Sequence, residues 1–74
     1  MKYEDLKNEV YEALKTKPTC LRNGQFVFNY IDTKYKNIAR IVQQDKNIDC
    51  FYDDSCIDTF IAECCAMINQ YEEL

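Results

Sequence analysis

Histidine and tryptophan are absent from the 74-residue sequence, which contains a single glycine and a single proline. The shortage of turn-forming residues argues against an all-β fold, because a small β domain needs several tight turns. The missing histidine excludes Ser-His-Asp and Cys-His catalytic arrangements, and no glycine-rich loop is present to hold phosphate groups. The chain therefore lacks the residue patterns of several large enzyme classes.

Metal-binding patterns are also missing, although the chain contains five cysteines. No Cys-x-x-Cys pair occurs, and zinc sites usually combine such pairs with further cysteine or histidine. The acidic stretch Asp49–Phe60 has neither the glycine nor the ligand spacing of an EF-hand calcium loop. We therefore expect no metal and no other cofactor, and we expect the cysteines to be free thiols that act as small apolar residues.

Long apolar runs are absent too, and the acidic, helix-patterned start of the chain does not resemble a secretory signal. We therefore expect a cytoplasmic protein without membrane contact. Residues 1–45 carry eight Lys or Arg and six Asp or Glu, whereas residues 46–74 carry one Lys and seven acids. Such an acidic part repels phosphate backbones, so nucleic-acid binding is not expected. It could attract a basic protein partner, or form a solvated helix face.

Hydrophobic periodicity indicates helices. Apolar residues make up 47% of the chain, which is enough for the core of one domain spanning residues 1–74. Residues 3–16 repeat apolar side chains at helical steps and end before Pro18, and residues 55–71 show the clearest helical period. The sequence therefore predicts an all-α domain of three or four short helices. The expected core residues are Leu6, Val10, Leu14, Phe28, Ile31, Ile38, Ile57, Phe60, Ile61, Cys64 and Ile68.

The segment between these two helices is compatible with more than one structure. Residues 24–43 predict one kinked helix or two short ones, because Asp32 and Thr33 both favour helix ends. A strand over residues 26–30 is the alternative, since aromatic residues favour strands. The helical prediction is preferred, with Asn23 as the N-cap.

The stretch Asp49–Phe60 is interpreted as the start of the last helix. Ser55 and Asp58 resemble a capping box, and Asp53 and Asp54 lie near the positive end of the helix dipole, where anions are stabilised. Paired carboxylates could instead serve acid–base catalysis, as in glycosidases, but so short a chain leaves little room for a substrate cleft. We therefore expect that the protein is not an enzyme.

Two short elements, RNGQFVFN at residues 22–29 and DCFYDD at residues 49–54, form a distinctive pattern. They resemble a group of small, mostly uncharacterised bacterial and phage proteins that share R-x-G-Q-x-x-F-N, then D-x-F-Y-D-D and an amphipathic helix. Cys50 stands where that group usually has proline, which implies a less rigid loop. The resemblance implies no enzymatic activity. It implies a bacterial or mobile-element origin, which is compatible with a helper or anti-defence role.

The polar residues of these two elements are interpreted first as a hydrogen-bonded network that specifies the fold, and a binding site formed by the same residues is the alternative. We expect Arg22 to pair with Asp53 or Asp54 in a shielded contact, with Gly24 allowing close backbone approach. The residues of the candidate site are Arg22, Gln25, Asn29, Tyr52, Asp53 and Asp54.

The leading functional hypothesis is a non-catalytic protein-interaction module of bacterial or phage origin. Its versions include an anti-CRISPR-like inhibitor and another factor that modulates a host protein. We expect a protein partner, or a second copy in a homodimer, because exposed aromatic side chains mark interfaces. The alternative is a small intracellular enzyme or a metal-dependent accessory protein that uses the region of Asp53 and Asp54.

Overall fold

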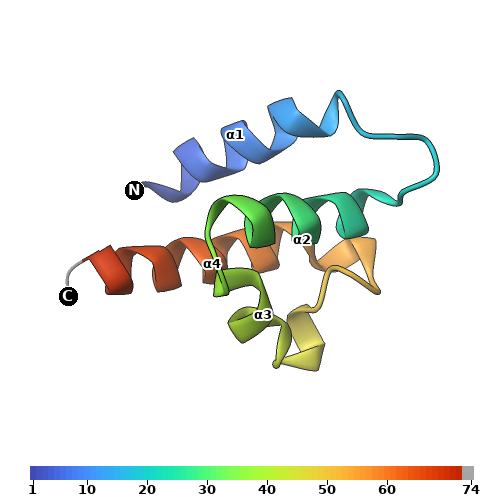
Figure 1. The fold of residues 1–74 in the computed structure, drawn as a ribbon. Coiled ribbons are helices and arrows are strands. Elements are labelled where there is room, and N and C mark those ends of the chain that lie inside the picture. Colours follow the sequence, from blue (N-terminus) through green and yellow to red (C-terminus); the bar gives the residue numbers. More distant parts are fainter. Residues whose placement is uncertain (73–74) are drawn as a thin grey trace.

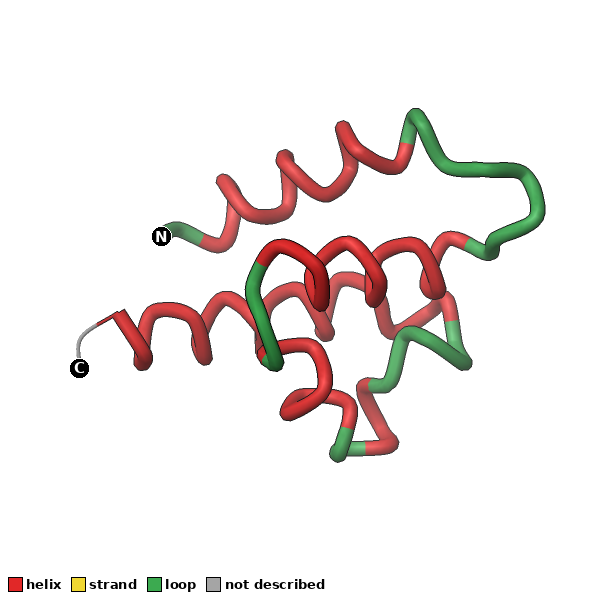
Figure 2. The backbone as a smooth tube through the Cα atoms, viewed as in Figure 1, coloured by secondary structure: helices red, strands yellow, loops and turns green. Residues whose placement is uncertain are grey.

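A computed structural model describes residues 1–72, and all regular elements within them are helical (Figures 1 and 2). This confirms the predicted all-α class, and the alternative strand over residues 26–30 is wrong. The elements are α1 (Tyr3–Leu14), α2 (Asn23–Lys34), α3 (Ile38–Gln43), the 3-10 helices η1 (Lys46–Ile48) and η2 (Asp54–Cys56), and α4 (Ile57–Glu72).

Helix α1 packs against both α2 and α4, whereas the short helix α3 packs against the other side of that pair (Figure 1). Helix α1 runs in the opposite direction to α2 and α4, so the start of the chain lies near the end of α4 (Figure 1). Asn69 holds this arrangement: its amide accepts from the amino group of Met1 and donates to the Met1 carbonyl, both at 2.8 Å.

The hydrophobic core lies where these helices meet, and it contains every predicted core residue except Leu14. That residue lies at the end of α1, where fewer elements cover it, and it is only partly buried. The core also contains five residues that were not predicted, namely Val27, Ala39, Val42, Cys50 and Cys65. All five cysteines are free thiols in the structure. The apolar side chains with no exposed surface are Leu6, Val10, Val27, Ile31, Ala39, Cys50, Phe60, Ile61 and Cys64.

The break between α2 and α3 lies later than predicted. It falls at residues 35–37, where Asn37 adopts a left-handed conformation with φ of 69°. Asparagine tolerates this region better than most residues, which explains why the chain turns here. Asp32 does not end the helix, because its carboxylate instead pairs with Arg40 of α3 at 3.3 Å.

Two predicted caps are also wrong. Asn23 is the first residue of α2, and Arg22 occupies the N-cap position. Ser55 lies inside the 3-10 turn that precedes α4, so Asp53 provides the cap: its Oδ1 accepts from the Ser55 N–H at 3.0 Å. Asp58 does not complete a capping box either, because its carboxylate accepts from the hydroxyl of Tyr11 on α1.

Candidate functional site

The two elements singled out in the sequence meet at the start of α2, in a contact we call the α2 junction: residues 22–25 against residues 49–54. The backbone N–H of Gly24 donates to Asp54 Oδ1 at 3.0 Å. The first N–H groups of a helix have no partner within the helix, and the helix dipole favours an anion there. Asp54 therefore caps α2 from a distant part of the chain.

The backbones of the two segments are in direct contact at Gly24. A Cβ atom on this residue would lie 1.9 Å from the Cys50 carbonyl oxygen and 2.7 Å from Asp54 Oδ1. The buried Cys50 thiol in turn donates to the Gly24 carbonyl at 3.5 Å. The predicted close approach is confirmed, and only glycine fits this position without moving the chain.

Arg22 covers the junction from the solvent side. Its guanidinium donates to the Phe51 carbonyl and, at 3.3 Å, to the Tyr52 carbonyl, and it lies 3.7 Å from Asp54 Oδ1. The predicted pairing is therefore present with Asp54. The expected shielding is wrong, because the Arg22 and Asp54 side chains are 45% and 46% exposed. The two backbones fill the interior of the contact and leave the guanidinium at the surface.

The carboxylates of the D-x-F-Y-D-D element all face backbone N–H groups. Asp49 Oδ1 accepts from Phe51, Asp53 Oδ1 from Ser55, and Asp54 Oδ1 from Gly24, each at 3.0 Å. Hydrogen bonds from the Ser55 hydroxyl and N–H hold the pKa of Asp53 below its ordinary value. A carboxyl group held ionised in this way is poorly suited to act as a general acid near neutral pH. The three hydrogen bonds brace the backbone of residues 49–55 and tie it to the start of α2.

The remaining predicted site residues lie apart from one another. Gln25 belongs to the junction, where its Oε1 accepts from the Arg22 N–H at 3.0 Å. Asn29 is exposed and lines a separate shallow groove beside Pro18 and Tyr30. The Tyr52 side chain points outward and is 73% exposed, with its ring set edge-on against Phe51. The structure therefore joins Arg22, Gln25 and Asp54, and separates Asn29 from them.

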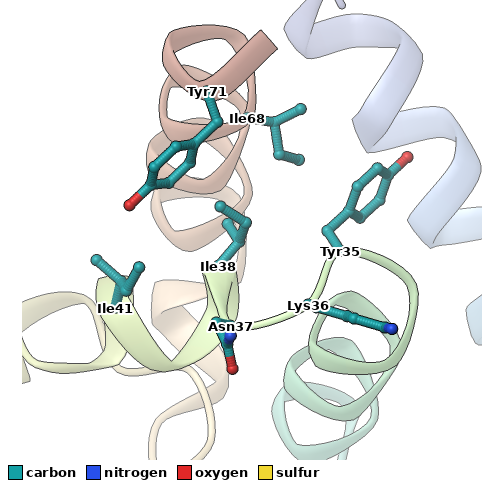
Figure 3. A pocket seen from close by; sticks show the side chains of 7 residues that line it. All are labelled: Tyr35, Lys36, Asn37, Ile38, Ile41, Ile68 and Tyr71. Carbon is teal, nitrogen blue, oxygen red and sulfur yellow. The ribbon is translucent and has the colours of Figure 1, made fainter. Parts of the chain in front are cut away.

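Sequence reasoning missed a larger apolar groove, of about 540 Å³, between α3 and the end of α4. We call it the α3–α4 groove. It exists because the six-residue α3 is too short to cover the sixteen-residue α4 along its whole length. Its walls are isoleucines and tyrosine rings, with polar residues on the α2–α3 connection (Figure 3). The lining residues are Tyr35, Lys36, Asn37, Ile38, Ile41, Ile68 and Tyr71.

One signal for this groove was present in the sequence. Tyr71 ends the apolar stripe of the last helix, a position that suggests core packing, yet its side chain is 51% exposed. Its ring stands over the groove, near Ile38 and Ile41 in Figure 3. An aromatic residue at the end of a helical stripe, with no partner helix of matching length, indicates an open apolar surface.

A second carboxylate-centred cluster holds the Tyr35 wall of the groove in place. Glu9 of α1 accepts from the Tyr30 hydroxyl at 2.7 Å, from Lys34 at 2.5 Å and from the Tyr35 hydroxyl at 3.3 Å. Desolvation raises the pKa of Glu9, but the hydrogen bonds from Lys34 and the two tyrosines outweigh it and lower the pKa overall. The cluster fixes the Tyr35 ring and neutralises Lys34.

Comparisons with protein-family models, curated proteins and solved structures found no match to this chain. Within residues 1–72, no helix combines the length and apolar character that crossing a membrane requires. In the same residues, no three His, Cys, Asp or Glu side chains are grouped so that they could hold a metal ion.

Proposed function

We propose that this chain is a non-catalytic protein-interaction module whose binding site is the α3–α4 groove. The observation that carries the proposal is an open apolar groove bordered by the half-exposed ring of Tyr71. Apolar grooves with aromatic borders are common anchoring sites for side chains of a protein partner. The Glu9 cluster supports this role, because its hydrogen bond to the Tyr35 hydroxyl restrains one wall of the groove before a partner binds.

The enzyme alternative finds less support. It depends on Asp53 and Asp54, and each of these carboxylates already accepts a backbone N–H group. The resemblance of the two sequence elements to small bacterial and phage proteins supports a bacterial or phage setting for the module. In that setting it would bind a host protein and inhibit or redirect it, as an anti-CRISPR-like inhibitor does.

Selection of displayed random peptides on the immobilised full chain tests this proposal. Selected peptides should bind the Ile41→Lys variant at least about ten-fold more weakly than the natural chain, because a lysine would place a charge in the apolar groove. Tyr71→Ala is the second groove variant. Tyr52→Ala is the matched control, since it removes an exposed tyrosine outside the groove.

Backbone NMR spectra then locate the bound peptide, with the largest shift changes expected at Ile38, Ile41 and Tyr71. The proposal is contradicted if no selected peptide depends on the groove residues. It is also contradicted if the shift changes centre on the α2 junction.

A further inference from the structure

The segment 49–54 presents an aromatic side chain that the fold does not use. Tyr52 is the most exposed of the large apolar or aromatic side chains within the described residues, and Asp53 beside it is exposed as well. The surrounding loop is braced, because Asp49, Asp53 and Asp54 each accept a backbone N–H at 3.0 Å. A ring held outward on a braced loop loses little conformational entropy when it binds.

The α3–α4 groove has the complementary chemistry. Its walls are apolar, and Lys36 is the cation at its border, with a side chain that extends toward α2 in Figure 3. The two neighbouring cations are already neutralised: Lys34 contacts Glu9 at 2.5 Å and Arg40 contacts Asp32 at 3.3 Å. Within residues 1–72, no ion pair involves Lys36, so the groove offers one uncompensated positive charge beside an apolar floor.

We infer that the α3–α4 groove of one copy binds the Tyr52 side chain of a second copy, with Asp53 facing Lys36. This inference rests on the proposed function, because it uses the same groove. Residues 49–54 do not line the groove, and in Figure 1 the gold loop and the red end of α4 lie on opposite sides of α3. A chain therefore does not fill its own groove, and the contact forms between copies.

Such an interface joins two different surfaces, so it builds chains or rings of copies, or closes as a reciprocal pair. Only one ring and a few flanking groups are buried at each contact, so the association is weak and depends on protein concentration. The charge pair between Asp53 and Lys36 makes it weaker as salt increases.

Sedimentation velocity over a range of concentrations, at low salt, tests the inference with the full chain. The natural protein should show a rising average mass, and Tyr52→Ala and Ile41→Lys should each raise the apparent Kd at least about ten-fold. Tyr52→Phe is the matched control and should associate normally, since it keeps the ring. Tyr71→Ala is the second groove variant, and circular dichroism checks that every variant folds.

A mixing experiment distinguishes this interface from any other. Tyr52→Ala and Ile41→Lys should each associate only weakly alone, but the first keeps its groove and the second keeps its tyrosine. Mixed together, they should form a one-to-one complex and nothing larger. For the charge pair, Asp53→Asn keeps an oxygen for the Ser55 cap while removing the charge, so it should weaken association without changing the fold.

A natural chain that stays monomeric at the highest concentration overturns the inference, as does a mixture that forms no complex. Unchanged association by Tyr52→Ala also overturns it. These results leave the proposed function standing if selected peptides still require Ile41 for binding. The groove then serves a foreign partner, and the second copy is excluded.

Discussion

The two ends of α2 are each anchored by a carboxylate from another element, but through different atoms. At the first end, Asp54 accepts from the backbone of Gly24, and the two backbones touch. At the other end, Glu9 accepts from the tips of Tyr30, Lys34 and Tyr35. A contact between backbones leaves no room for adjustment, whereas side-chain tips can move or be replaced by water. The free energy of unfolding should therefore depend on side-chain size at the first end of α2 and on side-chain charge at the second.

The largest effect is expected for Gly24→Ala. In an ordinary helix position, this change stabilises by about 0.5–1 kcal/mol because alanine restricts the unfolded chain. Here the new Cβ would lie 1.9 Å from the Cys50 carbonyl oxygen, so the segments must separate. We expect a loss of about 3 kcal/mol in the free energy of unfolding, measured with urea.

The neighbouring substitution Asn23→Ala serves as the control, because Asn23 is exposed in the same helix turn. Its effect should stay within about 0.5 kcal/mol. If Gly24→Ala proves as mild as Asn23→Ala, the backbone contact is not what anchors this end of α2.

A smaller, pH-dependent effect is expected for Glu9→Gln at the other end of α2. Loss of the ionised acceptor should lower the free energy of unfolding by about 1–2 kcal/mol at pH 7. The pKa of Glu9 is lowered on folding, so its charge stabilises the fold above the ordinary value of 4.5, and this contribution disappears as pH falls through the folded pKa. The stabilities of natural and variant protein should therefore converge in acid.

Urea unfolding at several pH values measures this convergence. Glu12→Gln is the matched control, since Glu12 lies on the same helix with its side chain 69% exposed. A difference between natural protein and Glu9→Gln that persists unchanged at pH values well below 4.5 would show that the Glu9 charge is not responsible.

The smallest effect is expected for the ion pair between Arg22 and Asp54. Both side chains are about half exposed and their charged atoms are 3.7 Å apart, so solvent screens the attraction. A double-mutant cycle with Arg22→Ala and Asp54→Ala should give a coupling energy below about 1 kcal/mol. Coupling above about 2 kcal/mol would mean that the pair is shielded from solvent, and the contrast between the two ends of α2 would weaken.

Hydrophobic periodicity in the sequence predicted the features that depend on local pattern, namely the helices and their buried faces. The apolar stripes of α1 and α4 were sufficient to identify both helices and most of the core residues that they contribute, because burial of one helix face leaves a repeat in the sequence. Other segments contribute core residues that were not predicted, namely Val27, Ala39, Val42 and Cys50.

The residues at which the helices begin and end were harder to predict. Asp32, Thr33 and Ser55 all have cap-forming side chains. Only the folded structure shows that Asp32 pairs with Arg40 and that Asp53, not Ser55, caps the 3-10 helix η2 before α4.

The candidate site was predicted only in part. A single glycine two residues after an arginine suggested a close approach of two backbone segments, and residues 22–25 do meet residues 49–54. Tyr71 at the end of the last apolar stripe was the one sign of the α3–α4 groove in the sequence, and the groove itself could not be predicted from either helix alone. It results from the unequal lengths of two helices and from the turn at Asn37, neither of which leaves a motif.

The free cysteines divide the molecule into zones of different chemical reactivity. Cys20 is exposed on the connector between α1 and α2, whereas Cys50 is buried at the α2 junction, where burial raises its pKa to about 12. Only the thiolate reacts with alkylating reagents, so Cys20 should be modified first and Cys50 only when the junction opens. The rate at which Cys50 is modified in the native protein therefore reports how often residues 49–54 separate from the start of α2.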